Sequence, residues 1–261
     1  MNNTLLEAKN VSITFGSLKA VSNFNFKLKE NELVGLIGPN GAGKTTVFNI
    51  LTGVYSPISG TYTFNNEVIH NMSTYKLVQK GIARTFQNIR LFKYMTVLDN
   101  VLVANNFNMK YGLLSGTFRL FSYWKEEKET RQKAIELLKI FDLDKYMDTQ
   151  AGNLPYGEQR KLEIARALAT NPKVLFLDEP AAGMNPTETE ELMRTIKFIK
   201  EKFKISIILI EHDMKLVLGI CERLIVLDHG NIIAEGDPYK VINDPVVVTA
   251  YLGKDEEGDE E

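Results

Sequence analysis

The segment at residues 38–45 has the residue types and spacing of a phosphate-binding loop. It fits the pattern G-x-x-x-x-G-K-[ST], and its candidate ligand-binding residues are Gly38, Pro39, Asn40, Gly41, Ala42, Gly43, Lys44, Thr45 and the adjoining Thr46. Glycines here let consecutive backbone N–H groups converge on phosphate oxygens, and Lys44 adds a positive charge. The hydroxyl of Thr45 is suited to bind Mg²⁺. The segment therefore predicts a site for ATP and Mg²⁺.

Two consecutive carboxylates, Asp178 and Glu179, follow the apolar run 174–177 and supply the acidic groups that a magnesium-nucleotide site needs. Asp178 is suited to orient the metal and its water ligands, and Glu179 is suited to polarise the attacking water as a general base. An apolar run that ends in Asp-Glu also occurs where acids cap the next helix, so the pair alone is a weak signal. Together with the phosphate loop, it favours nucleotide hydrolysis.

The elements that would position these residues are strands that alternate with helices. Runs 33–37, 174–177 and 205–210 are short apolar strands of the kind that enters a buried sheet. A helix follows the phosphate loop, and another, between the last two strands, is predicted to begin with a capping box at Thr187 and Glu190. This alternation predicts a mostly parallel sheet.

Other strands show alternating hydrophobicity instead. They are expected at residues 11–15, at 24–28, in a hairpin at 61–69 that turns at two asparagines, and in a last hairpin at 224–234. The first of these strands are expected to form an antiparallel edge of the core.

Between these strands, from about residue 96 to 170, the apolar period is helical. One helix is expected to begin near Lys125 and to bury Ala134, Leu137, Leu138 and Phe141 on one face.

The composition is that of an ordinary globular protein, with 44% hydrophobic and 25% charged residues in 261. Six acids fall within residues 255–261, which predicts a disordered acidic tail, and the rest of the chain carries too small a positive excess to indicate nucleic-acid binding. The lone Cys221 excludes an internal disulfide framework. No secretory signal is found, and no apolar run reaches the roughly 18 residues of a membrane span, so any membrane association is expected to come through a partner.

Between the phosphate loop and the two carboxylates stands the sequence LPYGEQR at residues 154–160, which resembles the signature of ABC ATPases. Its candidate nucleotide contacts are Pro155, Tyr156, Gly157 and Glu158. Phe15, Gln87 and His212 follow the order of the remaining family marks, and the resemblance runs from about residue 6 to 253.

By this resemblance, the adenine stacks on Phe15, Gln87 links the metal site to the membrane domain, and His212 hydrogen-bonds the γ-phosphate and the attacking water. Taken singly, each has a plainer interpretation: Phe15 as a core residue, Gln87 as a polar strand end and His212 as a histidine with satisfied hydrogen bonds. His70 and His229 lack such a context and are predicted to be turn or surface residues.

The resemblance implies an α/β fold: a phosphate-loop ABC ATPase core with an antiparallel β edge and an inserted helical subdomain at about 96–170. Residues 1–254 would form a single ABC ATPase domain. The implied partners are a second ATPase subunit, identical or paralogous, two membrane-spanning permease subunits and, indirectly, a substrate-binding protein, with no nucleic acid. The expected location is the cytoplasmic face of the cell membrane, held there peripherally by the permeases.

Two departures from the family pattern point to a subfamily. Pro155 replaces the usual signature serine and has no hydroxyl to offer a γ-phosphate, and Asn185 stands where many relatives have aspartate. Both features, and an aromatic insertion at 105–124, resemble the ATPases of branched-chain amino-acid importers. An exporter motor and a soluble phosphate-loop enzyme, such as a kinase or a nucleic-acid-handling ATPase, remain alternatives. Residues 88–97 are predicted to line a groove for a membrane-domain helix, with core packing as the alternative.

Overall fold

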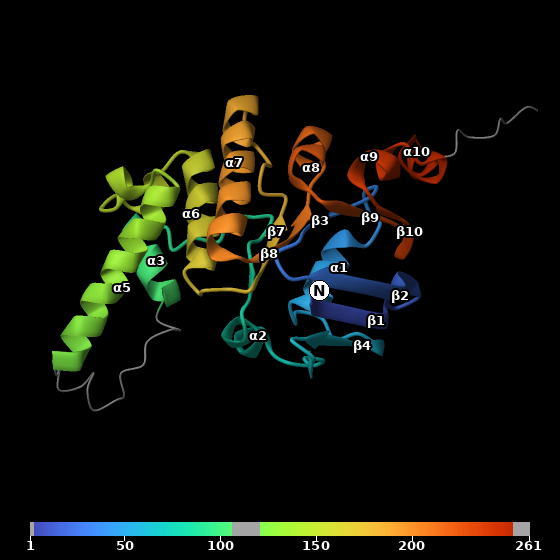
Figure 1. Ribbon diagram of the computed structural model, residues 1–261, viewed down its shortest axis with the longest axis horizontal. Coiled ribbons are helices and arrows are strands. Elements are labelled where there is room, and N and C mark those ends of the chain that lie inside the picture. The colour runs from blue at the N-terminus through green and yellow to red at the C-terminus, as the bar shows by residue number, and fades with distance from the viewer. Residues whose placement is uncertain (1–2, 106–120, 253–261) are drawn as a thin grey trace, which may run out of the picture.

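A six-stranded sheet forms the centre of the computed structural model, which describes residues 3–105 and 121–252 (Figure 1). Its strands are β3 (Leu33–Ile37), β6 (Ile82–Arg84), β7 (Val174–Asp178), β8 (Ser206–Ile210), β9 (Arg223–Asp228) and β10 (Asn231–Gly236). They lie in the order β10-β9-β3-β8-β7-β6, and every pair is parallel except β9 with β10. The predicted parallel sheet and the last hairpin are confirmed.

A second, antiparallel sheet is built from β1 (Thr4–Phe15), β2 (Leu18–Lys29), β4 (Ser59–Phe64) and β5 (Glu67–Val68). This is the predicted antiparallel edge, and it forms a sheet of its own. β1 and β2 are longer than predicted. The register of their pairing shifts between Ala8 and Val11, where Asn10 has a φ of 51°. This irregularity interrupts the alternation of apolar and polar residues on which the prediction rested. The predicted turn at Asn65 and Asn66 is confirmed by positive φ at both residues.

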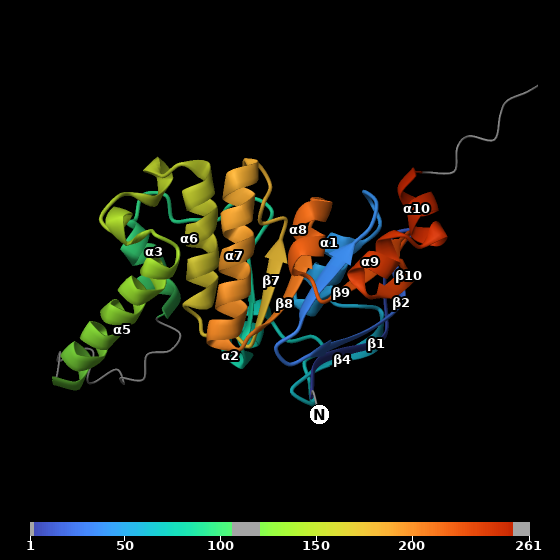
Figure 2. The ribbon, with the colours of Figure 1, turned by 45° about the horizontal axis from the view of Figure 1, so that its top comes forward.

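The remaining elements are mostly helices, which flank the central sheet. They are α1 (Lys44–Leu51), α2 (Thr74–Lys80), α3 (Val97–Asn105), α5 (Phe121–Ile140), α6 (Tyr156–Leu168), α7 (Pro186–Phe203), α8 (Met214–Ile220), α9 (Pro238–Ile242) and α10 (Pro245–Leu252). The predicted helical block corresponds to α3, α5 and α6, which lie at the end of the molecule opposite the antiparallel sheet (Figures 1 and 2). Helices α9 and α10 follow the last hairpin and were not predicted. The proposed domain limits stay a prediction.

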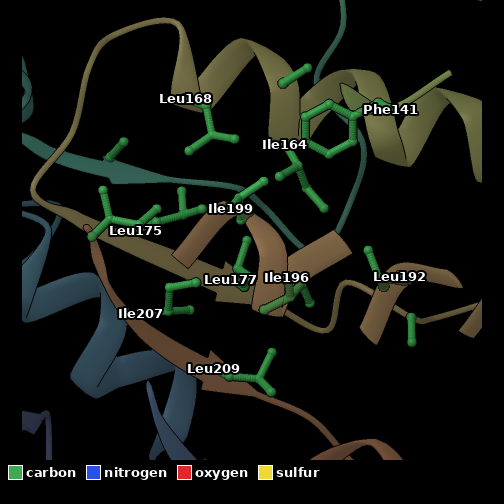
Figure 3. Close-up of a cluster of buried hydrophobic side chains, with 14 of the residues drawn as sticks. Phe141, Ile164, Leu168, Leu175, Leu177, Leu192, Ile196, Ile199, Ile207 and Leu209 are labelled. Carbon is green, nitrogen blue, oxygen red and sulfur yellow. The ribbon is translucent and has the colours of Figure 1, made fainter. Parts of the chain in front are cut away.

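The central sheet is covered on both faces, which explains why its strands are continuously apolar. On one face, Val34, Phe176 and Ile208 belong to a core shared with α1 and the antiparallel sheet. On the other face, strand residues pack against α6, α7 and the end of α5 (Figure 3). Figure 3 labels Phe141, Ile164, Leu168, Leu175, Leu177, Leu192, Ile196, Ile199, Ile207 and Leu209 in this second core. The two cores hold β3 and β7 in place, and both strands end at the candidate site.

Helix α7 begins differently from the prediction. Its N-cap is Asn185, whose side chain accepts a hydrogen bond from the N–H of Glu188 at 3.0 Å, while the Glu188 carboxylate accepts from the N–H of Asn185 at 2.9 Å. The predicted capping box at Thr187 and Glu190 is therefore wrong. Pro186 occupies the first helical position and fixes the start two residues earlier, and asparagine caps helices better than threonine does.

Helix α5 (Phe121–Ile140) already contains Lys125, so the predicted start near Lys125 is too late. Its predicted buried face is confirmed at Ala134, Leu137 and Leu138. Most of the predicted insertion at 105–124 and all of the acidic tail at 255–261 lie outside the described residues. None of the helices in the described ranges has both the length and the apolarity of a membrane span.

Candidate functional site

The phosphate loop joins β3 to α1, and two of its glycines have no room for a side chain. A Cβ on Gly38 would lie 2.0 Å from the carbonyl oxygen of Leu227, and one on Gly43 would lie 2.6 Å from that of Ala20. The φ angles of these glycines are 146° and 101°, which other residues rarely adopt. The loop backbone is therefore in direct contact with two other segments, and α1 begins immediately after it at Lys44.

The loop is also tied to the turn between β9 and β10. The N–H of Gly230 in that turn donates to the carbonyl of Ala42 at 3.0 Å, and the Gly230 carbonyl accepts from the N–H of Ser22 at 2.8 Å. A Cβ on Gly230 would lie 2.6 Å from the carbonyl oxygen of Ala20. The phosphate loop, β2 and the turn between β9 and β10 thus meet at Gly230.

Lys44 is buried, and its ammonium group stays within the loop. The Nζ atom donates to the carbonyl oxygens of Gly38 at 2.7 Å and Pro39 at 2.8 Å. Burial lowers the pKa of Lys44, while the negative charges of Glu179 and Asp178 oppose that shift. A buried ammonium group beside converging backbone amides has the electrostatics of a phosphate contact.

Asp178 ends β7 and forms a buried ion pair with Arg84 at the end of the neighbouring β6. Its Oδ2 atom lies 2.7 Å from Nη2 of Arg84. Burial raises the pKa of Asp178, and the Arg84 guanidinium opposes the shift. Arg84 also donates to Asn49 and Thr52 of the α1 region. Sequence analysis missed Arg84; the available signal was a basic residue at the end of a strand that pairs with the carboxylate strand.

Glu179 contacts two other predicted site residues, Gln87 and His212. Its Oε2 atom accepts a hydrogen bond from Nε2 of Gln87 at 3.0 Å, and its Oε1 atom lies 2.9 Å from Nε2 of His212. The backbone at Glu179 has a φ of 46°, and its N–H donates to the carbonyl of Ile210 at 2.9 Å. Both oxygens of the carboxylate are therefore oriented by side chains from separate loops.

A cavity of about 540 Å³ lies between the phosphate loop and Glu179. Its lining consists of Phe15, Leu18, Lys19, Ala20, Asn40, Gly41, Ala42, Gly43, Lys44, Thr45, Thr46, Gln87, Glu179, His212 and His229. Phe15 is 44% exposed and packs edge-to-face on Tyr55, so its core interpretation is wrong. His229 lies in the β9–β10 turn, as predicted, and also lines the cavity.

The signature residues do not line this cavity. Pro155 is the N-cap of α6 and makes no side-chain cap bond, and both it and Tyr156 are exposed. Gly157 is buried, and a Cβ there would lie 3.0 Å from Oε1 of Glu188. The structure thus groups the phosphate loop with Gln87, Glu179 and His212, and places residues 155–158 elsewhere.

Arg160, on α6, links the signature helix to the loop that carries Gln87. Its guanidinium donates to the carbonyl oxygens of Phe86 at 2.7 Å and Gln87 at 2.8 Å, and it also forms an ion pair with Glu163 at 2.9 Å. The second oxygen of Glu163 accepts from the N–H of Arg90 at 3.2 Å. Both side chains of the pair are buried. Sequence analysis missed them; an Arg and a Glu three positions apart within the apolar pattern of α6 was the available signal.

Known proteins resemble this chain over nearly its whole length. The profile of the ABC transporter family matches residues 21–182. The high-affinity branched-chain amino acid transport ATP-binding protein BraF of Pseudomonas aeruginosa is 42% identical over 97% of this chain and 100% of its own length. The corresponding protein LivG of Escherichia coli strain K12 is 45% identical over the same shares.

Solved structures give the same result. The ADP conformation of MJ1267, an ATP-binding cassette of an ABC transporter, has a TM-score of 0.83 and 35% identity and covers 97% of this chain and 100% of its own. The dimeric bacterial ABC transporter cassette MJ0796 has a TM-score of 0.76 and 27% identity, covering 90% of this chain and 99% of its own. The chain therefore belongs to the ABC transporter family, as one of its ATP-binding cassettes.

Proposed function

We propose that the chain is the ATP-hydrolysing motor subunit of an importer for branched-chain amino acids. The observation that carries the hydrolytic part is the carboxylate of Glu179, held by Gln87 and His212 at the wall of the phosphate-loop cavity. The cargo is supported by the full-length similarity to BraF and LivG, whose names state branched-chain amino acid transport.

ATP occupies the cavity with its phosphates against residues 38–46 and its adenine on Phe15. The exposed Phe15 ring is available for stacking because Tyr55 contacts it only edge-to-face. Lys44 exchanges its two carbonyl contacts for phosphate oxygens. This exchange is favourable because an ammonium–phosphate hydrogen bond is stronger than one to a neutral carbonyl.

The residues at this site fit Mg²⁺. Thr45, Gln87 and Asp178 offer hard oxygen donors, which Mg²⁺ prefers. Within the described part of the chain, no group of three or more His, Cys, Asp or Glu side chains comes together to hold a metal. Thr45, Gln87 and Asp178 would hold the ion together with substrate phosphates, and the ion would neutralise phosphate charge there. Arg84 keeps the buried carboxylate of Asp178 in place.

Glu179 is the general base. It accepts a proton from the water whose oxygen attacks the γ-phosphorus, and the bond from that phosphorus to the bridging oxygen breaks to leave ADP. His212 lies 2.9 Å from one oxygen of Glu179 and so fixes the direction of the carboxylate. The family resemblance also implies a hydrogen bond from His212 to the γ-phosphate. Gln87 donates a hydrogen bond to the other oxygen of Glu179 and would contribute to the metal site.

Residues 155–158 lie outside the cavity of their own chain, so the nucleotide that they contact is that of a second ATPase subunit, as the family resemblance implies. The dimeric structure of the related MJ0796 cassette supports such a pair. Pro155 leaves the opposite γ-phosphate without a hydroxyl donor, a loss of about 1.5–3 kcal/mol where no other donor replaces it. The second subunit is identical or paralogous, and the pair binds two permease subunits at the cytoplasmic face of the membrane, with a substrate-binding protein acting through them.

The test of this function is transport by the purified complex. The tagged full chain is isolated from its native membrane with its partners, the co-purified proteins are identified, and the complex is reconstituted in liposomes with the associated binding protein. Uptake of labelled leucine should require ATP and should stop in a complex carrying Glu179→Gln, while labelled lysine should not enter. Partners without membrane spans, or ATP-driven export of leucine, would contradict the proposal.

A further inference from the structure

Glu211 is a buried carboxylate that the proposed hydrolysis steps do not use. It follows β8 directly and precedes His212, and it is only 4% exposed. A buried carboxylate is unfavourable unless hydrogen bonds compensate for its lost hydration. Its contacts therefore indicate what it does in the fold.

Those contacts are backbone N–H groups from two different segments. The Oε1 atom accepts from the N–H of Ala181 at 2.7 Å, and the Oε2 atom accepts from the N–H of His212 at 3.1 Å. Burial raises the pKa of Glu211; the N–H groups of Ala181, His212 and Asp213 oppose this shift, and the charge of Glu179 adds to it. One side chain thus uses both of its oxygens to join two loops.

The two loops carry the general base and its histidine partner. Ala181 lies two residues after Glu179, within a turn in which the N–H of Ala182 donates to the Glu179 carbonyl at 3.2 Å. That turn starts from the positive φ of Glu179, an uncommon conformation for a residue with a side chain. A bond at Ala181 therefore restrains the turn next to its strained residue.

We propose that Glu211 is a positioning residue for ATP hydrolysis, which sets the relative placement of Glu179 and His212 by binding the backbone of both loops. This inference rests on the proposed role of Glu179 as the base. It assigns Glu211 no contact with ATP, metal or water. Its loss is therefore expected to change turnover and to leave nucleotide binding intact.

The first test is Glu211→Gln in the full chain. The amide keeps the size of the side chain but has one acceptor oxygen, so either the Ala181 or the His212 N–H faces an NH₂ group. The kcat for ATP is expected to fall about ten- to a hundredfold, because small misplacements of reacting groups have effects of this size. The Kd for ATP should change less than about twofold. Amide hydrogen exchange at 181 and 212 should accelerate.

Glu32→Gln is the matched control. Glu32 is another buried carboxylate, 8% exposed, and it accepts from the N–H of Lys29 and from Arg223 at the far end of β3. It should lower the urea midpoint without lowering kcat under folding conditions. If Glu211→Gln proves too unstable to measure, Glu211→Asp keeps the charge but is one methylene shorter, so it is expected to reach only one of the two amides and to give the same loss of kcat.

Glu179→Gln is assayed in parallel to separate this inference from the proposed function. If Glu179→Gln keeps its turnover, the assignment of the base is wrong. If Glu179→Gln stops turnover but Glu211→Gln stays within twofold of the unmodified chain, only the role of Glu211 is refuted. An equal loss of kcat in Glu32→Gln and Glu211→Gln would also refute it, because general destabilisation would then explain both.

Discussion

At the scale of single residues, Glu179 combines an uncommon backbone conformation with a fully engaged carboxylate. Its φ is 46°, and conformations of this kind cost about 1–3 kcal/mol in residues other than glycine. Gln87, from one loop, and His212 and the carbonyl of Ile210, from the end of β8, hold it there by hydrogen bonds. The direction in which the carboxylate can accept a proton is thus fixed by the fold.

The first prediction separates the base from the phosphate contact. Glu179→Gln should keep ATP affinity and lower the hydrolysis rate about 10²–10⁴-fold, because the amide preserves the volume of the side chain and cannot take the proton. Lys44→Ala should instead raise the Kd for ATP, since it removes the buried ammonium group of the loop. Nucleotide titration and phosphate release measure the two effects. Near-normal turnover in Glu179→Gln would contradict the assignment.

The site residues that sequence could predict are those that form short motifs. The loop at 38–46 and the pair Asp178-Glu179 are recognisable because their chemistry lies in consecutive residues. Arg84 and Arg160 were not predicted, because their partners lie more than 70 positions away. These partners are Asp178 for Arg84 and the backbone of Phe86 and Gln87 for Arg160. Only the folded sheet and the packed helix α6 bring them together.

At the scale of elements, the buried pair Arg160–Glu163 fixes helix α6 to the loop of Gln87. The second prediction is that Arg160→Met destabilises the chain by about 3–5 kcal/mol, because it leaves the Glu163 carboxylate buried without its partner. Urea unfolding measures the change. Lys204→Met, which breaks an exposed pair with Glu201, is the control and should shift the urea midpoint far less, because water and salt screen an exposed pair. Equal losses of unfolding free energy in both variants would show that the buried pair stabilises the fold no more than the exposed pair does.

The start of helix α7 gives the third prediction. Asn185→Ala should lower the free energy of unfolding by about 0.5–2 kcal/mol, because the N–H of Glu188 loses its side-chain acceptor. Thr187→Ala should have almost no effect, since Thr187 is exposed and lies inside the first turn. Thermal or urea denaturation of both variants measures the difference. A larger loss in Thr187→Ala would restore the capping box expected from sequence.

The elements that sequence located best are the continuous apolar strands. β3, β7 and β8 were predicted to within about one residue, because both faces of the central sheet are buried and only apolar residues fit. β1 was found only in part, since the shift in register near Asn10 breaks the alternation. The start of α7 was misplaced because two cap patterns overlap there, and the proline at the first helical position, Pro186, was not given its weight.

At the scale of the whole molecule, residues 88–97 present exposed aromatic side chains on an anchored backbone. Phe92 is 50% and Tyr94 92% exposed. The side chain of Asn100 hydrogen-bonds both the N–H and the carbonyl of Phe92, at 3.0 and 3.1 Å. Leu91, by contrast, is partly buried and packs against the core, which is the alternative that the sequence left open for this segment.

The fourth prediction concerns this surface. Phe92→Asp and Tyr94→Asp should leave a folded chain that binds ATP, but should weaken its association with the permease subunits and uncouple transport. Leu91→Asp should instead destabilise the chain, because it would bury a charge. Co-purification, leucine uptake and thermal denaturation distinguish these effects. Full transport by both aromatic variants would exclude the surface as a docking site.

The meeting of three chain segments at Gly230 also has a consequence for protein synthesis. The phosphate loop is hydrogen-bonded to Gly230, and β3, which leads into the loop, pairs with β8 on one side and β9 on the other. All of these partners lie beyond residue 205, so a chain emerging from the ribosome carries the complete loop sequence long before β8, β9 and Gly230 are available to support it. Such long-range pairing forms late. We therefore expect affinity for nucleotide to appear only when translation is nearly finished, and chains that terminate before residue 230 to bind ATP more weakly than the full chain.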